Sequence, residues 1–128
     1  MTKATAEAKT AMRKEVDAVQ PGGTTYTLGA LREAFTLAGA LDPSYKLRES
    51  GARIDTIFLL SDGGPTELPK GDTVKLMDPE IILETVRQWN RDAGIVIHCI
   101  AVDTGTGGTI FLKALADQNG GRFVDRKN

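Results

Sequence analysis

The stretch IDTIFLLSDGGPT, residues 54 to 66, decides the fold class of this chain. Residues 56 to 60 form an uninterrupted run of apolar and β-branched side chains, without the alternation of polar residues that is typical of a strand with one face in water. Such a run is typical of a strand in a parallel sheet that is buried on both faces. The run ends in Ser-Asp-Gly-Gly-Pro, so a single carboxylate, Asp62, is predicted at the carboxyl end of a buried strand.

The rest of the chain adds helices and strands in alternation. Apolar residues at spacings of three and four predict helices at 3–19, 28–40, 78–94 and 110–119, and apolar runs predict strands at 95–102 and 122–124. Because strands alternate with helices, we expect right-handed crossovers and a parallel sheet covered on both faces. Residues 1–128 are expected to form a single α/β domain.

Composition excludes several classes of function. With 17 acidic and 16 basic side chains the net charge is −1, which makes no case for binding nucleic acid or an anionic membrane. Cys99 is the single cysteine, so neither a disulfide nor a cysteine-rich metal site is expected. No segment reaches the length of a membrane span, and the N-terminus lacks the apolar stretch of a signal peptide. The cellular compartment stays open.

Two polar features predict a ligand site at the carboxyl edge of the sheet. Ligands of parallel α/β sheets bind outside the carboxyl ends of the strands, where Asp62 is expected. The turn PGGTT, residues 21–25, offers hydroxyl groups on a glycine-rich backbone that a ligand can approach closely. Carboxylates, hydroxyls and water are the ligands that Mg²⁺ prefers.

Four segments of the chain resemble, in order, the von Willebrand factor type A (VWA) domain of the bacterial type. They are GGTTYTLGALREAF, DTIFLLSDGGPT, ILETVRQWNRDAGIVIHCIAVDTG and FLKALADQNGGRFV. The resemblance spans nearly the whole chain, but it covers only the C-terminal portion of the family's fold. It implies a three-layer, Rossmann-like, doubly wound and mostly parallel sheet, here incomplete, with about three strands and four helices. It also implies a protein–protein interaction or adhesion module and no enzyme.

The family's metal ion-dependent adhesion site joins three parts. These are an Asp-x-Ser-x-Ser run after the first strand, a threonine that matches Thr24, and an aspartate that matches Asp62. The bound metal keeps an open position for an acidic side chain of a protein partner. This chain contains no Asp-x-Ser-x-Ser. The resemblance therefore implies an incomplete site at which Mg²⁺ or Mn²⁺ binds weakly or not at all. It places partner recognition on the surrounding loop residues Thr25, Gly63, Gly64 and Pro65.

The missing first strand has a consequence for association. In the family's sheet that strand lies beside the one that matches residues 56–61. Without it, this strand is expected to be a long apolar edge, which is the kind that pairs with other chains. We therefore expect self-association through 56–61. A fragment of a longer gene, a chain completed by a separate partner and a marginal monomer prone to association are the three alternatives.

Two functions of other classes stay open. The glycine-rich turn DTGTGGT, residues 103–109, precedes a helix, and free N–H groups at such a position favour phosphate. The alternative is thus a phosphate- or nucleotide-binding α/β enzyme, although the turn lacks the lysine of a P-loop and the full dinucleotide fingerprint. A purely structural fragment with no site of its own is the second alternative.

Three reactive side chains are interpreted structurally. Ser61 is not part of a G-x-S-x-G motif, and no residue after it is spaced as the general base of a nucleophilic serine would be. His98 is predicted to be a neutral histidine packed under a helix. Cys99 is predicted to be a small core residue.

Overall fold

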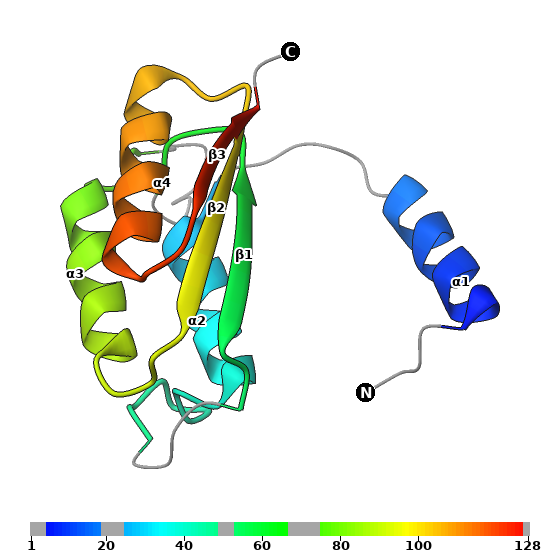
Figure 1. Cartoon of the computed structure of the whole chain (residues 1–128), viewed down its shortest axis with the longest axis horizontal. Coiled ribbons are helices and arrows are strands. Elements are labelled where there is room, and N and C mark those ends of the chain that lie inside the picture. The colour runs from blue at the N-terminus through cyan, green and yellow to red at the C-terminus, as the bar shows by residue number, and fades with distance from the viewer. Residues whose placement is uncertain (1–4, 19–24, 49–52, 67–74, 127–128) are drawn as a thin grey trace.

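The computed structural model describes residues 5–18, 25–48, 53–66 and 75–126 (Figure 1). The elements in chain order are α1 (Ala6–Asp17), α2 (Thr27–Ala38), β1 (Thr56–Ser61), α3 (Pro79–Asn90), β2 (Val96–Val102), α4 (Thr106–Gln118) and β3 (Phe123–Arg126). The predicted order of helices and strands is confirmed. The largest differences are at α4 and α3. Helix α4 begins about one turn before the predicted residue 110 and so takes in two glycines of the glycine-rich turn, and α3 ends at Asn90, about one turn before the predicted residue 94.

The three strands form one parallel sheet in the order β1-β2-β3. Phe58 of β1 lies beside His98 of β2, and Cys99 of β2 lies beside Phe123 of β3. The connection from β1 to β2 contains α3, and the connection from β2 to β3 contains α4. The prediction of an incomplete, parallel, Rossmann-like α/β fold is therefore confirmed.

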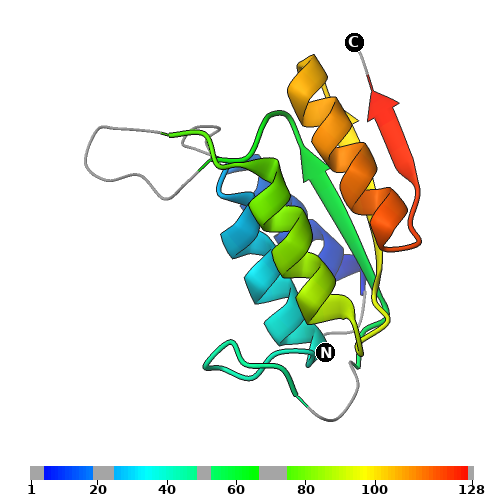
Figure 2. The ribbon, with the colours of Figure 1, turned by 90° about the vertical axis from the view of Figure 1, so that its left-hand side faces the viewer.

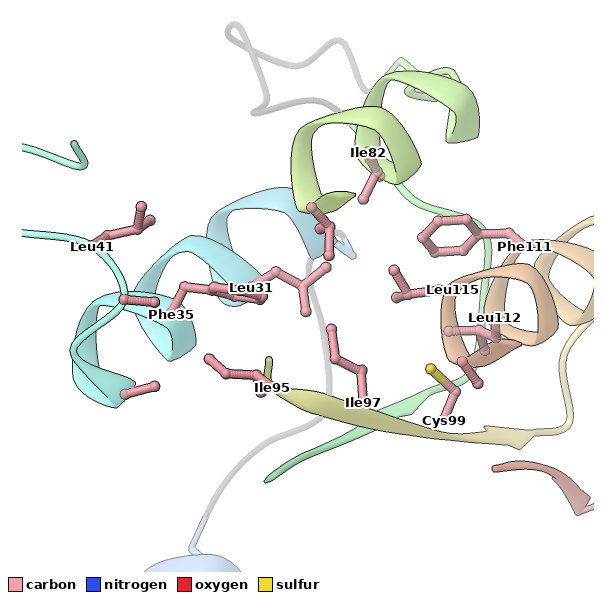
Figure 3. Close-up of a cluster of buried hydrophobic side chains, with 14 of the residues drawn as sticks. Leu31, Phe35, Leu41, Ile82, Ile95, Ile97, Cys99, Phe111, Leu112 and Leu115 are labelled. Atoms are coloured by element: carbon pink, nitrogen blue, oxygen red, sulfur yellow. The ribbon is translucent and has the colours of Figure 1, made fainter. Parts of the chain in front are cut away.

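The hydrophobic core lies between the sheet and helices α2, α3 and α4 (Figure 2). Alternate residues of β2 point into it, because side chains alternate between the two faces of a strand. The largest fully buried side chains are Phe35, Leu31, Leu41, Ile82, Ile95, Ile97, Leu112, Leu115, Val86 and Cys99 (Figure 3). The ring of Phe35 packs against Trp89, with centroids 5.7 Å apart. This cluster joins three helices to the central strand.

The opposite face of the sheet is open, and the prediction that β1 is buried on both faces is wrong. Phe58 and Leu60 are 67% and 62% exposed, and Val124 of β3 is 40% exposed. The reason is the strand order. The strands follow one another in one direction across the sheet, and right-handed crossovers that all step the same way lie on the same face. Within the described residues, the sheet therefore carries one helical layer instead of two.

Helix α1 contributes nothing to this core. Thr5 caps it by accepting a hydrogen bond from the backbone of Ala8 at 3.2 Å. None of its residues is buried, and its apolar residues Met12 and Val16 are 67% and 64% exposed. Figure 1 shows it away from the sheet. None of the described helices has both the length and the apolar character needed to cross a membrane.

Candidate functional site at the carboxyl edge of the sheet

Two loops that are distant in sequence meet where β1 ends. The backbone N–H of Thr66 donates to the carbonyl of Thr25 at 2.9 Å. A methyl group added at Gly63 would lie 3.9 Å from Oγ1 of Thr25. The turn before α2 and the loop after β1 are thus held against each other at the carboxyl edge. Thr24, the predicted metal-binding threonine, lies outside the described residues.

A third segment, the first turn of α4, closes on the same loop. A Cβ atom added at Gly108 would lie 3.2 Å from the carbonyl carbon of Gly63 and 3.4 Å from the nitrogen of Gly64. Only a glycine allows this approach without movement, so packing explains why this residue is glycine. Thr104 and Thr109 join their hydroxyl oxygens at 2.8 Å across the start of the helix. The glycine-rich turn therefore has a structural role beside any anion-binding one.

Asp62 stands at the tip of β1 with an exposed side chain. The neighbouring Ser61 shapes the turn, because its hydroxyl donates to the carbonyl of Gly63 at 3.2 Å and accepts from the N–H of the same residue at 3.4 Å. This is a structural hydroxyl and not an activated nucleophile. Among the described residues, no group of three His, Cys, Asp or Glu side chains is arranged to hold a metal ion. Any cation at Asp62 would depend on hydroxyl groups, carbonyls and water.

The other predicted loop residues differ in accessibility. Thr25, Gly63 and Gly64 are half-buried, whereas Pro65 is buried and its carbonyl accepts from the N–H of Met77 at 3.0 Å. Pro65 therefore anchors the loop, and the accessible backbone at this edge belongs to the two glycines and to Thr25.

His98 lies on the open face of the sheet, so the prediction that it packs under a helix is wrong. Its ring stacks on Phe58 with centroids 4.9 Å apart, and its Nδ1 accepts from the backbone N–H of Arg122 at 2.9 Å. This bond fixes the beginning of β3 against β2. The alternation of β2 sends its even-numbered residues to the open face, and the sequence did not show which face that was.

Cys99 points the other way and is fully buried, as predicted for a core residue. Burial raises the pKa of its thiol to about 12, because the thiolate would lose its hydration. A neutral, enclosed thiol is a poor nucleophile and a poor metal ligand.

Sequence reasoning missed a second surface, the open face of the sheet. A shallow hollow of about 410 Å³ on this face is lined by Phe58, His98, Ile100, Arg122 and Val124. All five residues lie in strands that the sequence predicted, and within each strand they occupy every second position. Strand order decides that these side chains are exposed, because it places the crossover helices α3 and α4 on the other face.

Comparison with family models, with curated proteins and with solved structures found no match to this chain. The fold class therefore rests on the structure alone.

Proposed function

We propose that this chain is a non-catalytic protein-interaction module of the VWA type. The meeting of two loops at the carboxyl edge carries the proposal. The turn that contains Thr25 and the loop that contains Asp62 resemble the two metal-site segments of that family, and the Thr66–Thr25 hydrogen bond of 2.9 Å holds them together. Recognition takes place through Thr25, Gly63 and Gly64, with Asp62 as the exposed charge.

A cation contributes little to recognition in this proposal. Asp62 and Thr24 supply one carboxylate and one hydroxyl, and Mg²⁺ gives up its water reluctantly for so small a set. Mg²⁺ or Mn²⁺ binds there weakly or not at all, and when one is bound it presents its open position to an acidic side chain of the partner. Without a cation, the partner contacts the half-buried glycine backbone directly.

Selection from a displayed peptide library tests the proposal without a known partner. The native chain is the bait, and the selected peptides are then measured against Asp62→Asn and Asp55→Asn. Both variants remove one exposed carboxylate, but Asp62 lies at the carboxyl end of β1 and Asp55 at its amino end. We expect selected peptides to lose at least tenfold in affinity, about 1.4 kcal/mol, for Asp62→Asn alone. Peptides that lose equally with both variants, or no selected peptide at all, would contradict the proposal.

Thermal melting measures the contribution of the cation separately. At a concentration equal to its Kd, a cation that binds only the folded chain stabilises it by RT ln 2, about 0.4 kcal/mol. That corresponds to a rise in Tm of roughly 1–2 °C for a domain of this size. We expect millimolar Mg²⁺ or Mn²⁺ to give no more than this rise relative to EDTA, and Asp62→Asn to abolish it. A rise several times larger would mean that a complete site exists.

A further inference from the structure

Strand β1 is an edge of the sheet, and every second residue along it has its backbone N–H and C=O directed away from the sheet. The N–H of Val96 donates to the carbonyl of Asp55 at 2.8 Å, so the odd-numbered residues of this segment direct their backbone groups towards β2. Backbone groups alternate sides along a strand. Those of Thr56, Phe58 and Leu60 therefore point away from the sheet, and no described strand pairs with them.

This edge lacks the features that keep natural edges from pairing. Charged side chains, prolines and bulges are the usual protection. The segment Thr56–Ser61 has no charged residue and no proline, and it pairs with β2 in unbroken register along all its residues. Two of its three outward-facing residues are also the exposed apolar ones, Phe58 and Leu60. The edge is thus straight, apolar and free to accept another strand.

We propose that β1 pairs antiparallel with β1 of a second copy of this chain, about a two-fold axis perpendicular to the sheet that passes beside Phe58. The outward-facing residues are centred on Phe58, so this register alone places all of them in hydrogen-bonded pairs. Thr56 faces Leu60 of the second copy, Phe58 faces Phe58, and Leu60 faces Thr56. Each such pair exchanges two bonds, which gives about six across the axis. The two sheets become one sheet of six strands, twice the three of each copy.

The charges that flank β1 favour this direction. In the antiparallel register Asp62 of one copy lies opposite the uncharged Ile54 of the other, between Arg53 and Asp55 of that strand, so it meets no charge of its own sign directly opposite. These charges are exposed, so they add little to the strength of the pairing and mainly select its orientation. A parallel pairing in register would place Asp62 beside Asp62, where like charges repel.

The pairing also covers part of the open face. Hydrogen-bonded partners in an antiparallel pair have Cα atoms about 5.5 Å apart, so the two Phe58 side chains come into contact on the same side of the joined sheet. Phe58 is 67% exposed in the single chain, and contact with its counterpart removes apolar surface from water. This inference concerns the edge of the sheet and does not depend on the loops of the proposed function.

Paired cysteine variants test the register directly. In Phe58→Cys the two thiols lie on the axis, with Cα atoms about 5.5 Å apart, which falls within the range that a disulfide bridges. In the matched control Leu60→Cys, the two copies of residue 60 are offset by four residues, or roughly 13 Å. The native Cys99 is fully buried and does not interfere. Under mild oxidation we expect Phe58→Cys to form a covalent dimer and Leu60→Cys to stay monomeric on a non-reducing gel.

Light scattering during size exclusion tests the association of the chain without added cysteines. We expect a concentration-dependent dimer of the native chain, which Thr56→Pro weakens at least tenfold. Proline is tolerated at the first residue of an edge strand, but it removes an outward N–H in each copy. Val124→Lys places a charge on the open face, on the strand furthest from β1, and should leave the dimer intact.

Three results would overturn the inference. They are a native chain that stays monomeric at every concentration, equal cross-linking of Phe58→Cys and Leu60→Cys, and a dimer that Val124→Lys abolishes while Thr56→Pro spares it. The last result would mean that open faces stack on each other. Thr56→Pro leaves the loops at the carboxyl edge unchanged, so its peptide binding reports on the proposed function independently.

Discussion

Adjacent glycines at the end of α4 should respond very differently to alanine. Gly120 has φ +67, and an added Cβ would meet nothing within 4 Å. At Gly121 the backbone takes no such conformation, but an added Cβ would lie 1.8 Å from the carbonyl oxygen of Ile97 and 2.4 Å from its carbonyl carbon. Gly120→Ala therefore costs conformational strain alone, whereas Gly121→Ala requires the beginning of β3 to move away from β2.

The size of that movement sets the expected loss of stability. Real Cβ atoms essentially never approach closer than 3.0 Å, so the separation must grow by at least 1.2 Å, the difference between 3.0 and 1.8 Å. A shift of this size breaks two bonds of 2.9 Å, from Cys99 N–H to the carbonyl of Arg122 and from Arg122 N–H to Nδ1 of His98. Two lost hydrogen bonds at about 1 kcal/mol each and an overpacking cost of about 1–3 kcal/mol give roughly 3–5 kcal/mol.

Gly120→Ala provides the matched control. An alanine in the left-handed conformation lowers the free energy of unfolding by about 1–2 kcal/mol. Alanine also restricts the unfolded chain more than glycine does, and this offsets about 0.4–1 kcal/mol of the loss. Urea unfolding and thermal melting of both variants measure the difference. We expect Tm to fall by roughly 10–20 °C for Gly121→Ala and by only a few degrees for Gly120→Ala. Equal losses, or a larger loss at Gly120, would refute the close approach of β3 to β2.

Two further predictions concern the core and its cysteine. Phe35→Ala should lower the free energy of unfolding by about 3–5 kcal/mol, because its ring is fully buried, whereas Met12→Ala on exposed α1 should change it by less than about 0.5 kcal/mol in urea titrations. Similar losses would mean that α1 is part of the core. The pKa of the Cys99 thiol is raised from its ordinary value of 9.0 to about 12, so the stability that it contributes is present below about pH 9 and is lost as pH rises towards 12. Unfolding free energies between these pH values should therefore fall more steeply for the native chain than for Cys99→Ala, and parallel curves would contradict this assignment.

The hydrophobic pattern was enough to predict the order and type of the elements. Strand β1 has six residues, and the helix predicted from residue 78 begins there, because Asp78 caps α3 by accepting from the N–H of Glu80 at 3.0 Å. The beginning of α4 was harder to predict. Its first turn contains Gly107 and Gly108, which are poor helix formers, and the close packing of Gly108 on Gly63 overrides that preference.

The sequence predicted where the candidate site lies, but it did not predict which of its residues are exposed or how they are hydrogen-bonded. Asp62 stands at a strand end as expected, and the turn of Thr25 lies against the loop after it. Burial of Pro65 and the use of the Ser61 hydroxyl within the turn depend on contacts across that loop, which spacing in a sequence does not encode. The metal-site assignment of Thr24 and Asp62 stays a prediction.

By itself, the sequence determined the α/β class, the parallel pairing and the position of a lone carboxylate at a strand end, because these depend on local periodicity and on short connections. Only the tertiary structure decided which side of each strand meets water. Phe58 and Leu60 are as apolar as the buried Ile97, so composition did not distinguish them. Strand order did, because the two crossovers, which contain α3 and α4, have one hand and step in one direction, which places both helices on the same face and leaves the other face exposed.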